Sequence, residues 1–85
     1  MVYYVYLILS KKVNKYISYV GYTSNLSRRI NLHNNSKGAK FTRGKKWKLI
    51  YFRKYYNKSN AMKEEYKLKK NYKLRKELIL NYIKK

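Results

Sequence analysis

A short polar turn separates two runs of β-branched and aromatic residues at the start of the chain. The first run, Val2 to Leu9, reads VYYVYLIL and is too short to form a buried helix, so it predicts a β-strand. Lys11 to Lys15 is polar, and Tyr16 to Tyr22 resumes the strand-like composition. Two such runs around a turn predict a β-hairpin. Because side chains alternate along a strand, we expect Tyr4 and Tyr6 to share one face.

A helical pattern follows the hairpin. Four residues recur at the spacing of one helix face, namely Leu26, Arg29, Ile30 and His33. Thr23 or Ser24 offers an N-cap before this stripe. Gly38 is expected to act after it as a left-handed cap or loop residue.

The rest of the chain continues with one strand and two helices. After the basic loop Lys37 to Lys46, the segment Trp47 to Phe52 (WKLIYF) predicts a third strand. Asn57 to Asn60 supplies a cap for a helix from about Ser59 to Tyr72. A last amphipathic segment has apolar residues at helical spacing, which are Leu74, Leu78, Ile79, Tyr82 and Ile83. The order β-β-α-β-α-α predicts an α/β or α+β domain with a small sheet covered by helices.

The chain is strongly basic, with 23 Lys and Arg against 3 Asp and Glu, a net charge of +20. No acidic residue precedes Glu64. Such a charge repels itself unless a polyanion offsets it, and each neutralised phosphate releases counterions. Nucleic acid is therefore the expected partner. An anionic membrane surface and a basic composition without a polyanion partner are the alternatives.

Other classes are disfavoured by composition. The chain is 45% hydrophobic, which argues against disorder despite the charge. No apolar run reaches the ~18 residues that would span a bilayer. The apolar N-terminal run lacks the charged start and the cleavage site of a signal peptide. The absence of Cys excludes disulfides and fits a reducing compartment. Because a signal peptide and a membrane span are also missing, we expect a cytoplasmic protein, with nucleic acid rather than a membrane as its partner.

Few residues could hold a metal ion. With three acidic residues, one His and no Cys, a zinc site or a carboxylate-rich two-metal site is not available. Magnesium needs only one or two carboxylates when substrate phosphates and water complete its shell, so cleavage of nucleic acid would favour one-metal chemistry.

Glu65 is the favoured carboxylate because it lies on the apolar stripe of its helix, whereas Glu64 points about 100° away. The other stripe residues are Ala61, Leu68 and Tyr72. An inward carboxylate is costly unless it is paired or binds a cation. Glu65 is therefore either a metal ligand or the ion-pair partner of an Arg or Lys on another element.

Two basic side chains and two tyrosines are further candidates. Arg29 and His33 are four residues apart, so they stack on one helix face. The guanidinium could hold a phosphate oxygen bidentately, and the imidazole could assist a leaving group. The alternative is an amphipathic helix with a snorkelling Arg and a packed His. Tyr6 and Tyr19 lie on adjacent predicted strands, where they could direct two phenols at one point or only pack.

Together these residues resemble the GIY-YIG nuclease family. The first signature is similar to residues 4–6 (YVY), and the second to residues 19–21 (YVG). The stretch Gly21 to Arg43 places Arg eight residues after the glycine and His four residues later, as in a small, single-domain bacterial subfamily. Ser59 to Ile79 keeps that subfamily's register, with S-x-A-x-x-x-E before a basic helix. The resemblance extends over nearly all of residues 1–85, as one nuclease-like domain.

The resemblance implies three antiparallel strands flanked by helices, and an endonuclease that hydrolyses phosphodiester bonds in DNA. The site residues that it implies are Tyr6, Tyr19, Arg29, His33 and Glu65. One tyrosine would help to activate the attacking water. Arg29, assisted by His33, would stabilise charge on the phosphate, and Glu65 would hold one divalent ion, Mg²⁺ or Mn²⁺.

The basic loop resembles the segment that meets the nucleic-acid backbone. The binding residues expected there are Lys40, Thr42, Arg43, Lys45 and Lys46. Tyr4 departs from the family by replacing the first glycine, which has no chemical role. Several relatives also place an Asn after the metal-binding Glu, and both Asn71 and Asn81 are candidates for it.

The expected substrate is DNA, with RNA left open, and the expected setting is structure-specific cleavage in repair or recombination. Target choice would come from the +20 surface, a protein partner or a homodimer. The alternative function is a non-catalytic nucleic-acid-binding module on the same fold. A binder could lose Glu65 at little cost, so its presence on an inward face favours cleavage.

Overall fold

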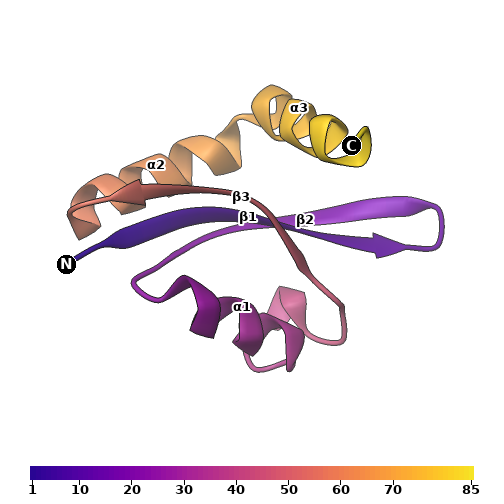
Figure 1. Ribbon diagram of the computed structural model, residues 1–85, viewed down its shortest axis with the longest axis horizontal. Coiled ribbons are helices and arrows are strands. Elements are labelled where there is room, and N and C mark those ends of the chain that lie inside the picture. Colours follow the sequence, from indigo (N-terminus) through magenta and orange to yellow (C-terminus); the bar gives the residue numbers. More distant parts are fainter.

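The computed structural model describes residues 1–85 as a three-stranded sheet between helices (Figure 1). The strands are β1 (Tyr3–Lys12), β2 (Lys15–Thr23) and β3 (Lys48–Tyr55), in the spatial order β2-β1-β3. Both neighbouring pairs are antiparallel. The predicted element order and the α+β class are confirmed.

Helices cover both faces of this sheet. They are α1 (Leu26–Asn34), the short 3₁₀ helix η1 (Lys40–Thr42), α2 (Lys58–Lys70) and α3 (Tyr72–Ile83). Figure 1 shows α1 on one side of the sheet, and α2 and α3 on the other. None of these helices is long and apolar enough to cross a membrane.

The central position of β1 explains its nearly continuous apolar sequence. Residues 5–10 are all buried, because β1 has a strand on each side and helices over each face. Val5 and Leu7 face the core formed with α2, which also contains Ala61 and Leu68. Tyr6 belongs to the core on the α1 side. Full burial of such apolar side chains contributes about 1.5–3 kcal/mol each.

The hairpin and the start of α1 differ from the sequence expectation. Lys11, Lys12 and Lys15 belong to the strands, which leaves only two residues between them. The N-cap of α1 is Asn25, whose side chain accepts a hydrogen bond from the Arg28 backbone N–H at 3.1 Å. The expected caps, Thr23 and Ser24, are wrong, because β2 continues through Thr23 and the helix begins at Leu26, directly after Asn25.

The ends of α1 and α2 also need correction. Asn35 is the C-cap of α1, and the left-handed backbone near it is at Ser36 (φ 60°), whereas Gly38 does not have positive φ. Helix α2 ends at Lys70 rather than at Tyr72. Asn71 interrupts the helical run because its side chain accepts from the Leu74 N–H at 3.0 Å and so begins α3.

Candidate active site

Tyr6 is the buried centre of the candidate site. It lies on β1, and its partner in the neighbouring strand is Gly21. A Cβ atom on Gly21 would overlap the hydroxyl end of the Tyr6 side chain. Any larger residue would therefore displace the phenol, which gives a physical reason for glycine at this point of the second signature.

A chain of hydrogen bonds leads away from the Tyr6 hydroxyl. The oxygen lies 2.7 Å from His33 Nε2, and His33 Nδ1 lies 2.8 Å from Thr42 Oγ1. Thr42 Oγ1 donates its single proton to the Ala39 carbonyl at 2.8 Å, so it must accept from His33 Nδ1–H. Neutral His33 then offers Nε2 as an acceptor, and the Tyr6 hydroxyl donates to it. The direction of every bond in the chain follows.

Burial determines the ionisation of the residues in this chain of hydrogen bonds. Tyr6, His33 and Thr42 are each at most 1% exposed. Burial lowers the pKa of His33, and the positive charge of Arg29 lowers it further, which keeps the imidazole neutral. Burial also raises the pKa of Tyr6 to about 12, although the neighbouring Arg29 guanidinium opposes that rise. The charges of Tyr19 and Glu65 raise the Tyr6 pKa further.

Gly38 gives His33 its space. A Cβ atom there would lie 2.5 Å from His33 Nδ1 and 3.0 Å from its Cε1. A side chain at this position would therefore push the ring away from Thr42. The glycine is needed for close approach to the imidazole, and not for the left-handed conformation expected from the sequence.

Tyr19 borders the same imidazole from β2. It pairs with Ile8, so it shares a sheet face with Tyr6 and lies diagonal to it. The Tyr19 and His33 rings meet edge-on with centroids 5.2 Å apart, and the Tyr6 and His33 centroids are 5.7 Å apart. Both tyrosines therefore lie against His33, as their strand positions allowed, but only the Tyr6 hydroxyl is hydrogen-bonded to it.

Arg29 lies one helical turn before His33 on α1. Neither of the two ion pairs in the structure includes it. Its charge acts on both Tyr6 and His33, which places the guanidinium at the edge of the buried chain. A guanidinium without a carboxylate partner can bind a phosphate oxygen through two N–H groups.

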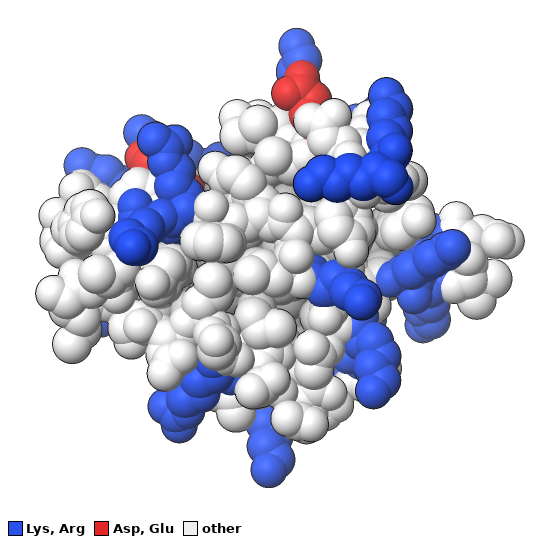
Figure 2. Space-filling view, in the orientation of Figure 1, with Lys and Arg blue, Asp and Glu red and all other residues white.

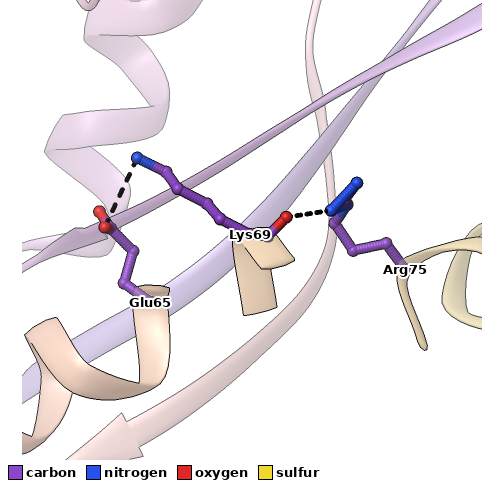
Figure 3. A network of polar contacts seen from close by, with 3 residues as sticks. All are labelled: Glu65, Lys69 and Arg75. Carbon is purple, nitrogen blue, oxygen red and sulfur yellow. Dashed lines mark hydrogen bonds and ion pairs between the residues drawn. The ribbon is translucent and has the colours of Figure 1, made fainter. Parts of the chain in front are cut away.

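Glu65 approaches from α2, the helix on the other side of the sheet. Its side chain is 19% exposed, against 34% for Glu64, which agrees with the predicted inward direction. Glu65 Oε1 lies 3.5 Å from Lys69 Nζ (Figure 3). The expected ion-pair partner on another element is wrong, since Lys69 is on the same helix. Its spacing of four residues was a usable signal that the sequence reasoning missed.

The C-terminal end of α2 is tied to α3. The Arg75 guanidinium donates to the Lys69 carbonyl at 2.6 Å (Figure 3). Asn71 lines a cavity of about 190 Å³ between β3, α2 and α3. Glu64 also lines this cavity, but Glu65 does not. Asn81 lies exposed on α3. Neither asparagine is hydrogen-bonded to Glu65 in the structure.

The donor set suits only one kind of metal ion. No three His, Cys, Asp or Glu residues come together in the structure, so Glu65 is a single carboxylate donor. Magnesium accepts such a site when phosphate oxygens and waters fill its other positions. The residues present thus fit an ion that is bound jointly with a nucleic acid.

The basic loop is divided between a surface and the core. Lys40, Arg43 and Lys46 are exposed, and Lys45 is half-buried with its ammonium 3.1 Å from the Phe41 carbonyl. Thr42, which was expected to meet nucleic acid, is fully buried and its hydroxyl is directed to His33. Figure 2 shows Lys and Arg spread around the visible face, with the acidic side chains in its upper part.

Comparison with known proteins identifies the family of this chain. The GIY-YIG catalytic domain matches residues 2–77. A UPF0213 protein of Oceanobacillus iheyensis is 43% identical over 67 residues, which cover 78% of this chain and 74% of that protein. A UPF0213 protein of Clostridium perfringens is 46% identical over 68 residues, covering 79% and 70% respectively.

A solved structure is similar over the whole fold. The solution NMR structure of a UPF0213 protein from Bacillus halodurans matches with a TM-score of 0.50 and 38% identity, covering 95% of this chain and 84% of that one. Tyr6 and the two glycines that contact the site, Gly21 and Gly38, all lie within the matched residues 2–77. The chain therefore belongs to the GIY-YIG family and carries its nuclease-type domain, in the group of small UPF0213 proteins.

Proposed function

We propose that the protein is a divalent-metal-dependent endonuclease that hydrolyses phosphodiester bonds in DNA. The observation that carries the proposal is the buried chain of hydrogen bonds from Tyr6 through His33 to Thr42. Burying polar groups costs free energy even when they are paired, and an apolar core would fold at least as well. A directed chain that ends at a phenol beside an unpaired guanidinium is instead suited to moving a proton near a phosphate.

In this mechanism, His33 Nε2 accepts the Tyr6 hydroxyl proton as the phenol takes a proton from the attacking water. The lowered pKa of His33 keeps Nε2 unprotonated and free to accept, and the phenol stays neutral because it takes one proton as it gives up another. The imidazole becomes an imidazolium, and hydroxide attacks phosphorus as the P–O bond to the leaving oxygen breaks. The leaving oxygen departs with the bonding electron pair and takes a proton from solvent water, and the imidazolium then releases its proton to solvent. Arg29 stabilises the charge that develops on the phosphate oxygens.

Glu65 is the residue that would hold the metal. When bound, Mg²⁺ or Mn²⁺ supplies Lewis-acid stabilisation of charge at the phosphate. Glu65 is mostly buried and lies on α2, the helix that packs against β1 and β2, which supports its membership of the same site. Tyr19 remains the other candidate base, although its hydroxyl has no hydrogen bond to His33.

The exposed cations of the basic loop support DNA as the substrate. Lys40, Arg43 and Lys46 can bind phosphates next to the site, and such contacts position a nucleic acid without reading its bases. Because such contacts do not read the base sequence, the protein would choose its target by the structure of the DNA, as in repair or recombination. A homodimer or a protein partner would add selectivity. RNA offers the same phosphates and is the second substrate to compare.

One observation favours the alternative, a binding module without catalysis. The Glu65–Lys69 ion pair satisfies the carboxylate without a metal. In that case Glu65 would only stabilise α2, and the exposed cations would bind DNA that is never cut.

The two functions separate in one experiment. Labelled linear, nicked, flap and branched DNA are incubated with the protein in Mg²⁺ or EDTA, and binding is followed by gel shift. Glu65→Gln should abolish the metal-dependent cutting while DNA binding persists. Glu64→Gln is the matched control, because this residue is adjacent on α2 and is also paired with a lysine, at 3.2 Å. Binding without cutting by the unaltered protein, with every DNA, would support the binding module.

A further inference from the structure

Phe41 presents an aromatic ring to solvent beside the candidate site. It lies in η1 and is 53% exposed. Its ring is nearly parallel to that of Tyr19, with an angle of 21° and centroids 6.2 Å apart. The Trp47 ring supports it from the core, with centroids 6.5 Å apart. Phe41 is therefore held in place, although half of its surface is unused by the fold.

The aromatic rings form a continuous path from the buried chain to the surface. His33 contacts Tyr19 edge-on, and Tyr19 in turn stacks with Phe41. Other large apolar side chains of this protein are also exposed, and single exposed residues need no explanation. Phe41 differs because it is the exposed end of this path, two ring contacts away from the imidazole of His33.

Phe41 lies within a basic segment of the chain. The Lys45 ammonium lies 5.2 Å from the ring centroid, and the exposed residues Lys40 and Arg43 are one and two positions away in the sequence. Proteins that bind single-stranded nucleic acid combine positive charge for the phosphates with aromatic rings on which bases stack. Lys45 is a flexible side chain, so its ammonium can move from the ring to a phosphate when a base arrives.

We propose that Phe41 is the stacking subsite for an unpaired nucleobase of the DNA adjacent to the scissile phosphate. The inference rests on the proposed function for the position of that phosphate. The base would lie on the exposed part of the Phe41 ring, with its phosphates bound by Lys40, Arg43 and Lys45. This subsite favours DNA with an unpaired base at that position over fully paired DNA, because a paired base has no free face.

The test measures stacking of a base on Phe41 directly. It is done in EDTA, which removes divalent metal ions, so the DNA is bound without being cut. A short single-stranded DNA carries one 2-aminopurine, placed at each position in turn, because stacking on an aromatic ring quenches this fluorescent base. Phe41→Leu should remove the quenching at one position and weaken binding about 5- to 150-fold, the range found for one stacked base. Phe41→Tyr should restore both, since it keeps the ring.

A second arm removes the base instead of the ring. At the same position, an abasic nucleotide should weaken binding by the unaltered protein, whereas Phe41→Leu should then cause no additional loss. The matched control is Tyr72→Leu, because Tyr72 is 67% exposed and has the Arg75 guanidinium 5.8 Å from its ring centroid, but lies on α3. That variant should leave quenching and affinity unchanged.

The outcomes separate the two proposals. Losses from Phe41→Leu that are the same with and without the base would overturn the stacking subsite, even if the protein cuts DNA. Equal losses in Phe41→Tyr and Phe41→Leu would overturn it too. Base-dependent losses in a protein that never cuts would retain the subsite and refute only the nuclease.

Discussion

The hydroxyl of Thr42 should determine which nitrogen of His33 carries the proton. Thr42→Val removes that hydroxyl and keeps the shape of the side chain. The His33 Nδ1–H then loses its acceptor inside a fully buried site, and the Ala39 carbonyl loses its donor. An unsatisfied buried group costs about 1–3 kcal/mol. Since Ala39 is half-buried and can bond to water, we expect a total loss near that range.

Two measurements check this expectation. Urea unfolding should show the free energy of unfolding of Thr42→Val reduced by about 1–3 kcal/mol. Imidazole ¹⁵N NMR reports the tautomer, and the signals are unambiguous because His33 is the only histidine of the chain. The unaltered protein should carry the proton on Nδ1, and Thr42→Val should shift population to the other tautomer, which cannot accept from Tyr6.

Thr42→Ser is the control that separates the hydroxyl from the packing. It should lose about 0.8 kcal/mol for the buried methyl group but keep the Nδ1–H tautomer. A proton on Nε2 in the unaltered protein would refute the direction that we assign to the hydrogen bonds. An unchanged tautomer and unfolding free energy in Thr42→Val would refute the role of the hydroxyl.

Three further predictions address the same site. The folded pKa of His33 lies below its usual 6.5, so the contribution of neutral His33 to stability is complete above pH 6.5 and is lost as the pH falls through the folded pKa. Urea unfolding between about pH 8 and pH 5 should show this loss. A similar loss in His33→Gln would contradict the assignment to His33. Gly21→Ala should cost about 1–3 kcal/mol because its Cβ overlaps Tyr6, and unchanged urea unfolding would contradict that overlap. Lys69→Gln should strengthen Mn²⁺ binding, measured by calorimetry, about two- to fivefold because it frees Glu65. If Lys69→Gln has the same effect in a protein that also carries Glu65→Gln, Glu65 is not the metal ligand.

The main elements of the fold could be predicted because each has a strong local pattern. The buried run of β1 and the stripe that selects Glu65 over Glu64 depend only on strand and helix periodicity. Helix caps are less determined. Thr23, Ser24 and Asn25 are three consecutive residues that can cap a helix, and only the end of β2 decides among them.

The buried hydrogen bonds could not be predicted, because they depend on contacts between distant segments. Thr42 is nine residues from His33, and it looks from the sequence like a polar residue of an exposed basic loop. Gly38 resembles a helix-terminating glycine, although its close neighbour is the imidazole. Lys69 was detectable from its spacing to Glu65, yet which cation a buried carboxylate pairs with depends on the final packing.

The candidate site joins the two sides of the sheet. The α1 side supplies Arg29 and His33, which surround Tyr6 of β1, whereas Glu65 comes from α2 on the opposite side (Figure 1). Burial is the main cause of the raised Tyr6 pKa, and the Glu65 charge adds a small further rise from the opposite side. Gly21 is the partner of Tyr6 on β2, and the absence of a side chain there leaves free the space that the phenol occupies. Because a larger residue there would displace the phenol from His33, this glycine links the shape of the sheet to the chemistry that we propose.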